Sequence, residues 1–235
     1  MYKGIYLALS GAVLKRRNMD LFAQNIANAN TPGYKKERIS FKDYIVPVDN
    51  KRDLTPDGRV MADLSKRIID FSSGTIQRTG NALDLAINGE GFFALEGNRY
   101  TRNGNFMISS DGYLATKEGV KVLGDGGPIA MQVGNIEISP SGDVLVDGAP
   151  SGKVSVVNFS DTGVLKKVGA GMFETAEAGS DVTAQISQGF LEQSNVNAIQ
   201  EMVQMMASTR EFESYQKIIQ SFDEAASKTI NELGK

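Results

Sequence analysis

The 235-residue sequence predicts an α+β fold: a central antiparallel β domain with long N- and C-terminal α-helices that form a coiled-coil-like layer. At both ends of the chain, apolar residues recur every three or four positions, which is the period of a helix with one apolar face. Between the ends, apolar residues fall in short alternating or continuous runs separated by glycine-rich turns, which is typical of β-strands.

The N-terminal helix is predicted from spacings of three and four that only Arg16 interrupts. It is expected to end at 30–33, because Pro32 disfavours the helical conformation at Thr31 and Gly33 permits a sharp change of direction. The apolar positions of its stripe are Ile5, Leu9, Ala12, Met19, Ala23 and Ile26.

The apolar run at 5–14 is similar to the hydrophobic part of a secretory signal peptide. However, Lys15, Arg16 and Arg17 follow it at once, where a cleaved signal usually has small residues. The helical pattern also continues past these three residues. We therefore expect that this segment is not a removable leader.

The β region begins at 83–87, where apolar and polar residues alternate, and continues after a turn at 89–91 into the apolar run 92–95. Asn103-Gly104 and Asp111-Gly112 predict type I′ hairpin turns, in which both residues have positive φ. A weak internal repeat relates 105–114 to 135–144, and each copy indicates strand, polar turn and strand. Together these signals predict a compact antiparallel β domain.

The C-terminal helix is expected to begin at Asn197, which can cap it, with Gln200 placed to reach back to the cap. No proline or glycine interrupts the pattern before Gly234, so the helix would be about 55 Å long at 1.5 Å per residue. Its stripe is predicted to comprise Met202, Met205, Thr209, Phe212, Gln216, Ile219, Asp223, Ala226, Ile230 and Leu233.

Two interpretations of the helical stripes remain open. The helices can pair with each other inside one chain, or their apolar faces can pack between subunits. One-to-one pairing of helices of such unequal length would leave several turns of apolar surface uncovered, and an uncovered apolar surface usually marks an interaction site. The expected domains are 1–33 with 196–235 (helical), 34–75 (a linker or small subdomain) and 76–195 (β-rich).

The composition excludes most enzyme chemistry. The chain has no histidine and no cysteine, so the commonest general base, the commonest metal ligand and thiolate sites are all missing. Gly89-Glu90-Gly91 lacks the rest of a nucleotide-binding motif. Asp84 and Glu90 are the best candidates for a carboxylate pair, but they are ordinary residues beside a turn. We expect no catalytic residue, cofactor, metal or small-molecule substrate.

A net charge of −3 indicates no general attraction to nucleic acid. A basic cluster is expected to lie on a solvated face of the protein. It comprises Lys15, Arg16 and Arg17, with Lys35, Lys36 and Arg38 beyond the helix. The alternative interpretation is a contact with an acidic partner.

Four segments carry a resemblance to a known family. Residues 21–34 (LFAQNIANANTPGY) resemble the N-terminal signature of flagellar rod and hook proteins. Residues 79–93 (TGNALDLAINGEGFF), 100–106 (YTRNGNF) and 192–197 (EQSNVN) are similar to further segments of the same family, and all four occur in family order. The modest length and the region 42–73 resemble the proximal-rod FlgF type more than the distal-rod FlgG type.

The resemblance implies a non-enzymatic axial component of the bacterial flagellar basal body. The terminal helices would form the inner layer of a tubular, torque-transmitting periplasmic rod, with the β domain outside. The implied partners are copies of this chain, other rod proteins and the flagellar type III export apparatus. Asn25 and Asn28 would bond a neighbouring subunit, Ser194, Asn195 and Asn197 would position the long helix, and the stripe residues would form the subunit contact.

Two other functions stay open from the residues alone. A β-rich module that binds a cell-wall polysaccharide would use the helices for its own packing. A carboxylate-dependent hydrolase would need two close carboxylates in a cleft.

Overall fold

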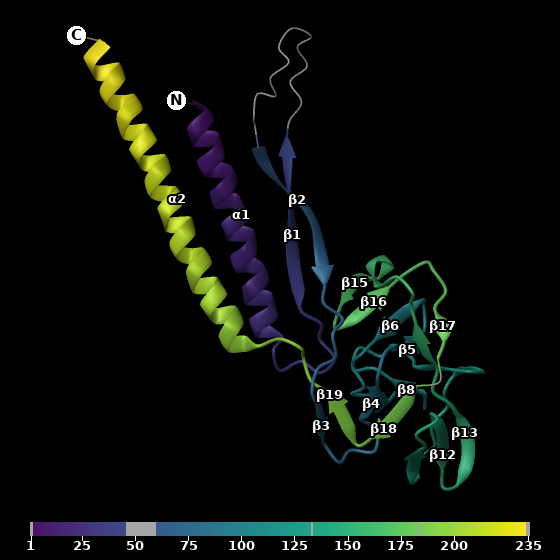
Figure 1. The fold of residues 1–235 in the computed structure, drawn as a ribbon. Helices are drawn as coiled ribbons and strands as arrows, with labels where there is room; N and C mark the ends of the chain where they lie inside the picture. The colour runs from purple at the N-terminus through teal and green to yellow at the C-terminus, as the bar shows by residue number, and fades with distance from the viewer. Residues whose placement is uncertain (1, 46–59, 133, 183, 234–235) are drawn as a thin grey trace, which may run out of the picture. The chain divides into compact units, whose positions relative to one another are not determined.

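The structure is a computed structural model that describes residues 2–45, 60–132, 134–182 and 184–233, with side chains for 4–39, 67–132, 134–182 and 184–228. The chain forms two compact units (Figure 1). The helical unit comprises Met1–Ala27, Glu37–Ile68 and Asn197–Lys235, and the β unit comprises Asn28–Lys36 and Ile69–Val196. The predicted α+β class, with terminal helices and a mostly β middle, is confirmed.

The segment expected to be a linker, 34–75, is divided between the two units. Its two ends belong to the β unit, and 37–68 belongs to the helical unit. Strands β1 (Glu37–Ile45) and β2 (Val60–Ile69) pair with each other as a two-stranded sheet. Residues 46–59 of this segment lie outside the described residues.

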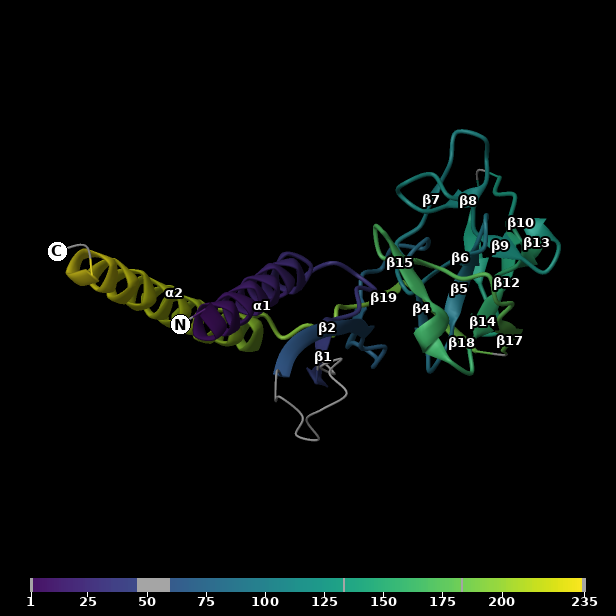
Figure 2. The same cartoon turned by 90° about the horizontal axis from the view of Figure 1, so that it is seen from above.

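The helical unit is built on α1 (Tyr2–Ala27) and α2 (Ala198–Leu233), which lie side by side along much of their length (Figures 1 and 2). Strand β1 contacts α1. Both predicted helices are present, and the 36 residues of α2 give a length of about 54 Å. The predicted cap is also confirmed, because the Asn197 Oδ1 accepts a hydrogen bond from the Gln200 N–H at 3.1 Å.

The β unit contains seventeen short strands and one 3₁₀ turn, η1, in its described residues. A six-stranded sheet has the order β15-β16-β6-β5-β14-β17, and smaller sheets pair β4 with β18, β3 with β19, β7 with β8, β9 with β10, and β11 with β12 and β13. The bounds are β3 (Ile76–Arg78), β4 (Leu85–Asn88), β5 (Phe92–Leu95), β6 (Arg99–Thr101), β7 (Met107–Ile108), β8 (Leu114–Ala115), β9 (Leu123–Gly124), β10 (Gly127–Pro128), β11 (Ile136–Ile138), β12 (Asp143–Val146), β13 (Ala149–Lys153), β14 (Val156–Asn158), η1 (Thr162–Val164), β15 (Lys166–Gly169), β16 (Met172–Glu174), β17 (Ser180–Asp181), β18 (Gln185–Gln188) and β19 (Phe190–Glu192).

Strand β5 is buried on both faces, which explains why its sequence is continuously apolar. Phe93 and Leu95 point into one hydrophobic cluster, and Phe92 and Ala94 point into a second. Successive side chains of a strand alternate between the faces of a sheet, so β5 separates two cores. In the second core, the Phe92 and Phe173 rings meet edge to face with centroids 5.8 Å apart.

The predicted internal repeat corresponds to two hairpins with equivalent turns. The Ser109 N–H donates to the Tyr113 carbonyl at 2.8 Å, and the equivalent Ser139 N–H donates to the Asp143 carbonyl at 2.9 Å. In each hairpin the glycine N–H donates back to the serine carbonyl at 2.9 Å. The first turn joins β7 to β8 and the second joins β11 to β12, so the repeat is confirmed.

The prediction of type I′ turns at Asn103-Gly104 and Asp111-Gly112 is wrong. Of these four residues, only Gly112 has a positive φ, of 76°. This single left-handed residue closes the β7–β8 hairpin. Gly104 has a different requirement. A Cβ at Gly104 would lie 1.7 Å from the carbonyl oxygen of Leu85, so glycine is needed there for close backbone approach.

Candidate assembly interface

Two glycines of α1 set its distance from α2. A Cβ built at Gly11 would lie 2.6 Å from the Tyr215 ring, and one built at Gly4 would lie 2.7 Å from the Phe222 ring. Each aromatic ring therefore occupies the space that a side chain would need. Because the residue numbers rise on α1 as they fall on α2, these contacts also show that the pair is antiparallel.

Polar contacts continue the same register. Lys15 forms an ion pair with Glu211. The Thr209 hydroxyl donates to the carbonyl of Met205 at 2.9 Å and also lies 3.3 Å from the sulfur of Met19. The helices are thus paired within one chain, which is the first of the two interpretations of their stripes.

The inner face of α2 differs from the predicted stripe at every second position. Met205, Phe212, Ile219 and Ala226 were predicted and are half-buried. The intervening inner residues are Glu201, Ser208, Tyr215 and Phe222, whereas the predicted Met202, Thr209, Gln216 and Asp223 are exposed. The phase is set by the fit of Tyr215 and Phe222 against glycines of α1, which periodicity within α2 does not reveal. The side chains of Ile230 and Leu233 lie outside the described residues.

On α1 the predicted stripe is also only partly sheltered. Ala12 is buried, and Ile5, Met19 and Ile26 are half-buried. Leu9 and Ala23 are exposed. The chain therefore leaves part of each predicted apolar surface in contact with solvent, and a role of these residues in subunit contact stays a prediction.

Asn25 joins three elements of the helical unit. Its Nδ2 donates to the Glu37 carbonyl and to Glu201 Oε2, both at 3.0 Å, and its Oδ1 accepts from the Glu37 N–H at 3.1 Å. The side chain is completely buried. Its amide was expected to hydrogen-bond a neighbouring subunit. In the structure it forms hydrogen bonds with β1 and α2 of its own chain.

The other amides predicted near the junctions also make contacts within the chain. The Asn28 Oδ1 lies 3.3 Å from the Thr31 hydroxyl, which donates to it. The Asn195 Nδ2 donates to the Asp70 carbonyl at 2.8 Å, and its Oδ1 accepts from the Lys36 N–H at 2.8 Å. The Ser194 hydroxyl accepts from the Val196 N–H at 3.2 Å. Asn195 thereby ties together segments of the β unit that are distant in sequence.

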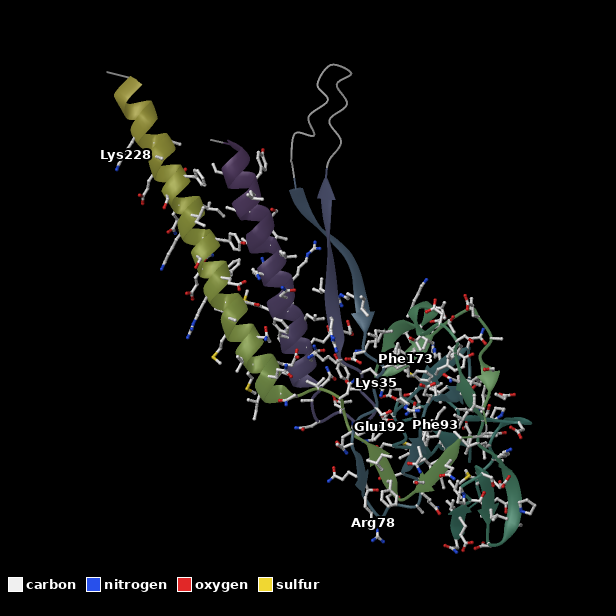
Figure 3. The ribbon with its side chains drawn as sticks, viewed as in Figure 1. Lys35, Arg78, Phe93, Phe173, Glu192 and Lys228 are labelled. Atoms are coloured by element: carbon white, nitrogen blue, oxygen red, sulfur yellow. The ribbon has the colours of Figure 1, made fainter. Side chains whose placement is uncertain are left out.

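A buried ionic cluster lies in the β unit, and Figure 3 labels two of its members, Lys35 and Glu192. The Glu192 carboxylate accepts from Lys35 Nζ at 2.7 Å and from the Gly74 N–H at 2.9 Å, and it forms an ion pair with Arg102, whose Nε lies 2.8 Å from Oε2. Arg102 also donates to the carbonyls of Gly89 and Gly91. The three charged side chains are at most 4% exposed.

The cluster corrects one prediction. Lys35 was grouped with Lys36 and Arg38 on a solvated or partner-binding face, but its side chain is buried. Burial lowers the pKa of Lys35 from its ordinary value, because the charged ammonium loses water, and the hydrogen bond to Glu192 opposes this effect. Nothing in the local sequence marks this cluster, since its members lie far apart in the chain.

Asp84 and Glu90, the candidate carboxylate pair, accept hydrogen bonds from different side chains. Asp84 Oδ1 accepts from the Asn105 and Asn81 side-chain amides at 2.6 and 3.2 Å. Glu90 Oε2 accepts from the Asn158 amide at 3.3 Å. Each carboxylate is therefore held by its own amide partners, as expected for residues that stabilise turns.

The described residues show neither a metal-binding cluster nor a membrane-spanning helix. They contain no group of three or more acidic side chains that could hold a metal ion. No helix among them has the length and apolar character needed to cross a membrane.

Comparison with known proteins identifies matches along most of the chain. Residues 5–35 match the family described as flagella basal body rod protein, 86–146 match the D1 domain of flagellar hook protein FlgE/F/G, and 187–233 match the C-terminal region of flagellar basal body rod FlgEFG proteins.

Individual relatives agree over nearly the full length. The flagellar basal-body rod protein FlgF of Caulobacter vibrioides is 34% identical, with 100% of this chain and 99% of that protein covered. FlgG of Bacillus subtilis is 33% identical, with 98% and 99% covered. FlgF of Salmonella typhimurium is 31% identical, with 95% of each covered. The chain therefore belongs to the family of flagellar basal-body rod proteins and is a structural protein rather than an enzyme.

Proposed function

We propose that this chain is an axial component of the bacterial flagellar basal-body rod, of the proximal FlgF-like type. Its terminal helices assemble it with copies of itself and with other rod proteins into a tubular, torque-transmitting rod in the periplasm. It reaches this position through the flagellar export apparatus. Contacts that repeat in the same direction without closing on themselves generate such a tube.

The proposal rests on one observation: the apolar side chains of α1 and α2 are only partly buried. Tyr6 and Leu7 of α1 are each 63% exposed, and Ile199 of α2 is 76% exposed. Large exposed apolar side chains concentrated on one element usually mark an interaction surface. The helices thus bury one face against each other and present other apolar residues for contact with neighbours.

A coiled-coil-like inner layer is the arrangement that we propose for the assembled helices. The inner residues of α2 follow spacings of four and three from Glu201 to Ala226. This is the average period of 3.5 residues that coiled coils use.

The distal FlgG-like type is the alternative, and it is supported by the 33% identity to the Bacillus subtilis FlgG over almost the whole chain. The FlgF-like type is favoured because the FlgF relative from Caulobacter vibrioides aligns over the full length of this chain.

Deletion and complementation in the source bacterium test the proposal. We expect the deletion strain to lose swimming and an epitope-tagged chain to restore it and to co-purify with basal bodies. Immunogold labelling should place the tag at the proximal part of the rod, whereas labelling at the distal part would support the FlgG-like type. Normal motility of the deletion strain, with intact rods that lack the chain when it is expressed, would refute the proposed function.

A further inference from the structure

The chain enters and leaves the β unit through two segments that lie side by side. Residues 33–36, here called the entry segment, follow α1, which ends at Ala27. Residues 192–195, here called the exit segment, precede α2, which begins at Ala198. Both segments belong to the β unit. Any force that the terminal helices exert along the chain therefore reaches the β unit at these two segments.

Three hydrogen bonds join the entry segment directly to the exit segment. The Gly33 N–H donates to the Glu192 carbonyl at 2.7 Å, and the Lys36 N–H donates to the Asn195 Oδ1 at 2.8 Å. Between them, Lys35 Nζ donates to the Glu192 carboxylate at 2.7 Å. Figure 3 labels Lys35 and Glu192, one residue of each segment. The contact thus extends over the full length of both segments.

The two segments run in the same direction. From Gly33 to Lys36 along the entry segment, the partner advances from Glu192 to Asn195 along the exit segment. The chain reaches α1 from the first end of the entry segment and α2 from the last end of the exit segment. A pull on the two helices therefore acts on opposite ends of two parallel segments, which loads the contact in shear. Bonds loaded in shear share the force, whereas bonds that are peeled apart break one after another.

A third segment, 70–72, contacts both of the others. Asn195 Nδ2 of the exit segment donates to the Asp70 carbonyl at 2.8 Å. Lys35 Nζ of the entry segment donates to the Ser72 carbonyl, also at 2.8 Å. Because both segments are bonded to the same neighbour, they cannot slide past each other without breaking these bonds as well.

The ionic centre of the contact strengthens it further. The side chains of Lys35, Arg102 and Glu192 are almost completely buried. Charge-assisted hydrogen bonds are roughly twice as strong as neutral ones, and they are electrostatically stronger inside a protein than in water. Sliding of the segments would also leave buried charges without partners, which is strongly unfavourable.

The contact closes the chain into a loop, so the part of the β unit between the two segments carries no load while the contact holds. We propose that the entry and exit segments form a mechanical clamp, which passes force between the terminal helices and shields the rest of the β unit from it. This inference rests on the proposed function, because a torque-transmitting rod is the source of the force.

Stretching single full-length chains by their two ends tests the clamp. The helices separate first, because the pull peels the antiparallel pair apart from its free end, and the load then reaches the clamp. Rupture of the clamp should release the β unit in one large step, since the roughly 155 residues between Lys36 and Glu192 extend to at most about 550 Å. Loss of the β unit in several small steps, at the loads that separate the helices, would overturn the proposal.

Glu192→Gln tests the ionic centre. The substitution leaves Lys35 and Arg102 without a carboxylate, so we expect the unfolding rate at a fixed load to rise about 100-fold or more. The matched control is Leu114→Ala in β8, a fully buried core residue outside the clamp whose loss destabilises the β unit comparably in denaturant. Its contacts are still intact when the clamp breaks, so it should raise the rate under load by less than about ten-fold. Equal increases would show that Glu192 contributes to stability only, and would overturn the clamp.

Asn195→Ala tests the other end of the contact and keeps the ionic centre intact, so it remains informative if Glu192→Gln does not fold. It removes the acceptor of the Lys36 N–H and the donor to segment 70–72. We expect about a ten-fold higher unfolding rate at a fixed load. Asn88→Ala, which removes an exposed hydrogen-bonded amide, is the control and should change the rate by less than about three-fold. An unchanged rate in Asn195→Ala would overturn the clamp.

The direction of the pull distinguishes shear from simple strength. The natural chain has no cysteine, so handles can be attached to cysteines placed at the exposed Asn30 and Gln185. These positions lie before the first ends of the entry and exit segments, so the force peels the contact open. We expect the β unit to unfold at least about ten-fold faster than under the same load applied to the chain ends. Equal rates in the two directions would overturn the shear arrangement.

The two proposals fail in different experiments. A chain that enters rods and supports swimming, but shows neither the single step nor the effect of Glu192→Gln when stretched, would overturn the clamp alone. A chain that resists shear in vitro but is absent from basal bodies would refute the proposed function, and with it the rod as the source of the force, while the resistance to shear would remain.

Discussion

The ring of Tyr215 lies directly against the backbone of Gly11, so closely that a Cβ on this glycine would come within 2.6 Å of it. Seven residues away on each helix, which is about two turns, Phe222 lies against Gly4 in the same way. These two contacts determine how closely the terminal helices approach and which residues of α2 face outward.

Gly11→Ala should reveal this contact, because its effect on the free energy of unfolding should change sign when the Tyr215 ring is removed. Alanine is favoured over glycine in a helix by about 1 kcal/mol, but here its methyl group meets the Tyr215 ring. We expect Gly11→Ala to lower the free energy of unfolding by about 1–2 kcal/mol in the natural chain, as overpacking does. Urea unfolding followed by circular dichroism at the helical band measures it.

In a Tyr215→Ala background the ring is gone, so Gly11→Ala should stabilise the helical unit by about 0.5–1 kcal/mol relative to that background. Stabilisation by the same amount in both backgrounds would show that Gly11 and Tyr215 do not interact.

Glu192→Gln should strongly destabilise the β unit. The substitution leaves Lys35 and Arg102 buried without the carboxylate that compensates both charges. Breaking a buried ionic cluster in this way typically costs about 3–5 kcal/mol of unfolding free energy. The exposed pair of Lys153 and Asp125, at 4.0 Å, provides the control, and Lys153→Met should cost less than about 1 kcal/mol. Similar losses for the two variants would contradict the buried placement of Glu192.

The lowered pKa of Lys35 predicts a specific dependence of stability on pH. In the unfolded chain this lysine has its ordinary pKa of 10.5, so between the lowered folded value and 10.5 the unfolded state binds more protons. The unfolding free energy of the natural chain should therefore rise, relative to that of Lys35→Met, as the pH increases through this window. Denaturant titrations of both proteins at matched pH values measure the difference, and a difference that falls with pH would exclude the lowered pKa.

Asn25→Ala should loosen the junction of α1, β1 and α2. The substitution removes the donor to Glu201 and both hydrogen bonds to the Glu37 backbone, in a fully buried position. Unsatisfied buried groups cost about 1–3 kcal/mol each, so we expect a loss of about 2–4 kcal/mol of unfolding free energy.

Hydrogen exchange gives a local check, since the Glu37 amide should lose protection in Asn25→Ala. As a control, Asn88→Ala removes an exposed amide that bonds Ser187 at 2.9 Å and should cost less than about 1 kcal/mol. Unchanged protection of Glu37 would contradict the role assigned to Asn25.

Patterns local to one element predicted much of the fold. The start of α2 follows from the capping residue Asn197, and the doubly buried β5 follows from the apolar run 92–95. The pairing of the β1 and β2 strands was not predicted, because their sequences mix charged and apolar residues.

The parts that depend on distant residues could not be predicted. The phase of the inner face of α2 depends on glycines of α1 that receive Tyr215 and Phe222. The buried cluster of Lys35, Arg102 and Glu192 joins three points far apart in the chain, and a charged residue is ordinarily expected at the surface. Only the tertiary structure shows that these side chains compensate one another.

Incorporation into purified basal bodies tests helix-mediated assembly most directly. A tagged chain that carries Val203→Glu and Met206→Glu on the outer face of α2 is compared with one that carries Gln204→Glu, and export of each is checked in the extracytoplasmic fraction. Both chains should fold and be exported, but only the Gln204→Glu chain should enter the rod and support swimming. Equal amounts of both chains in basal bodies would contradict assembly through this helix.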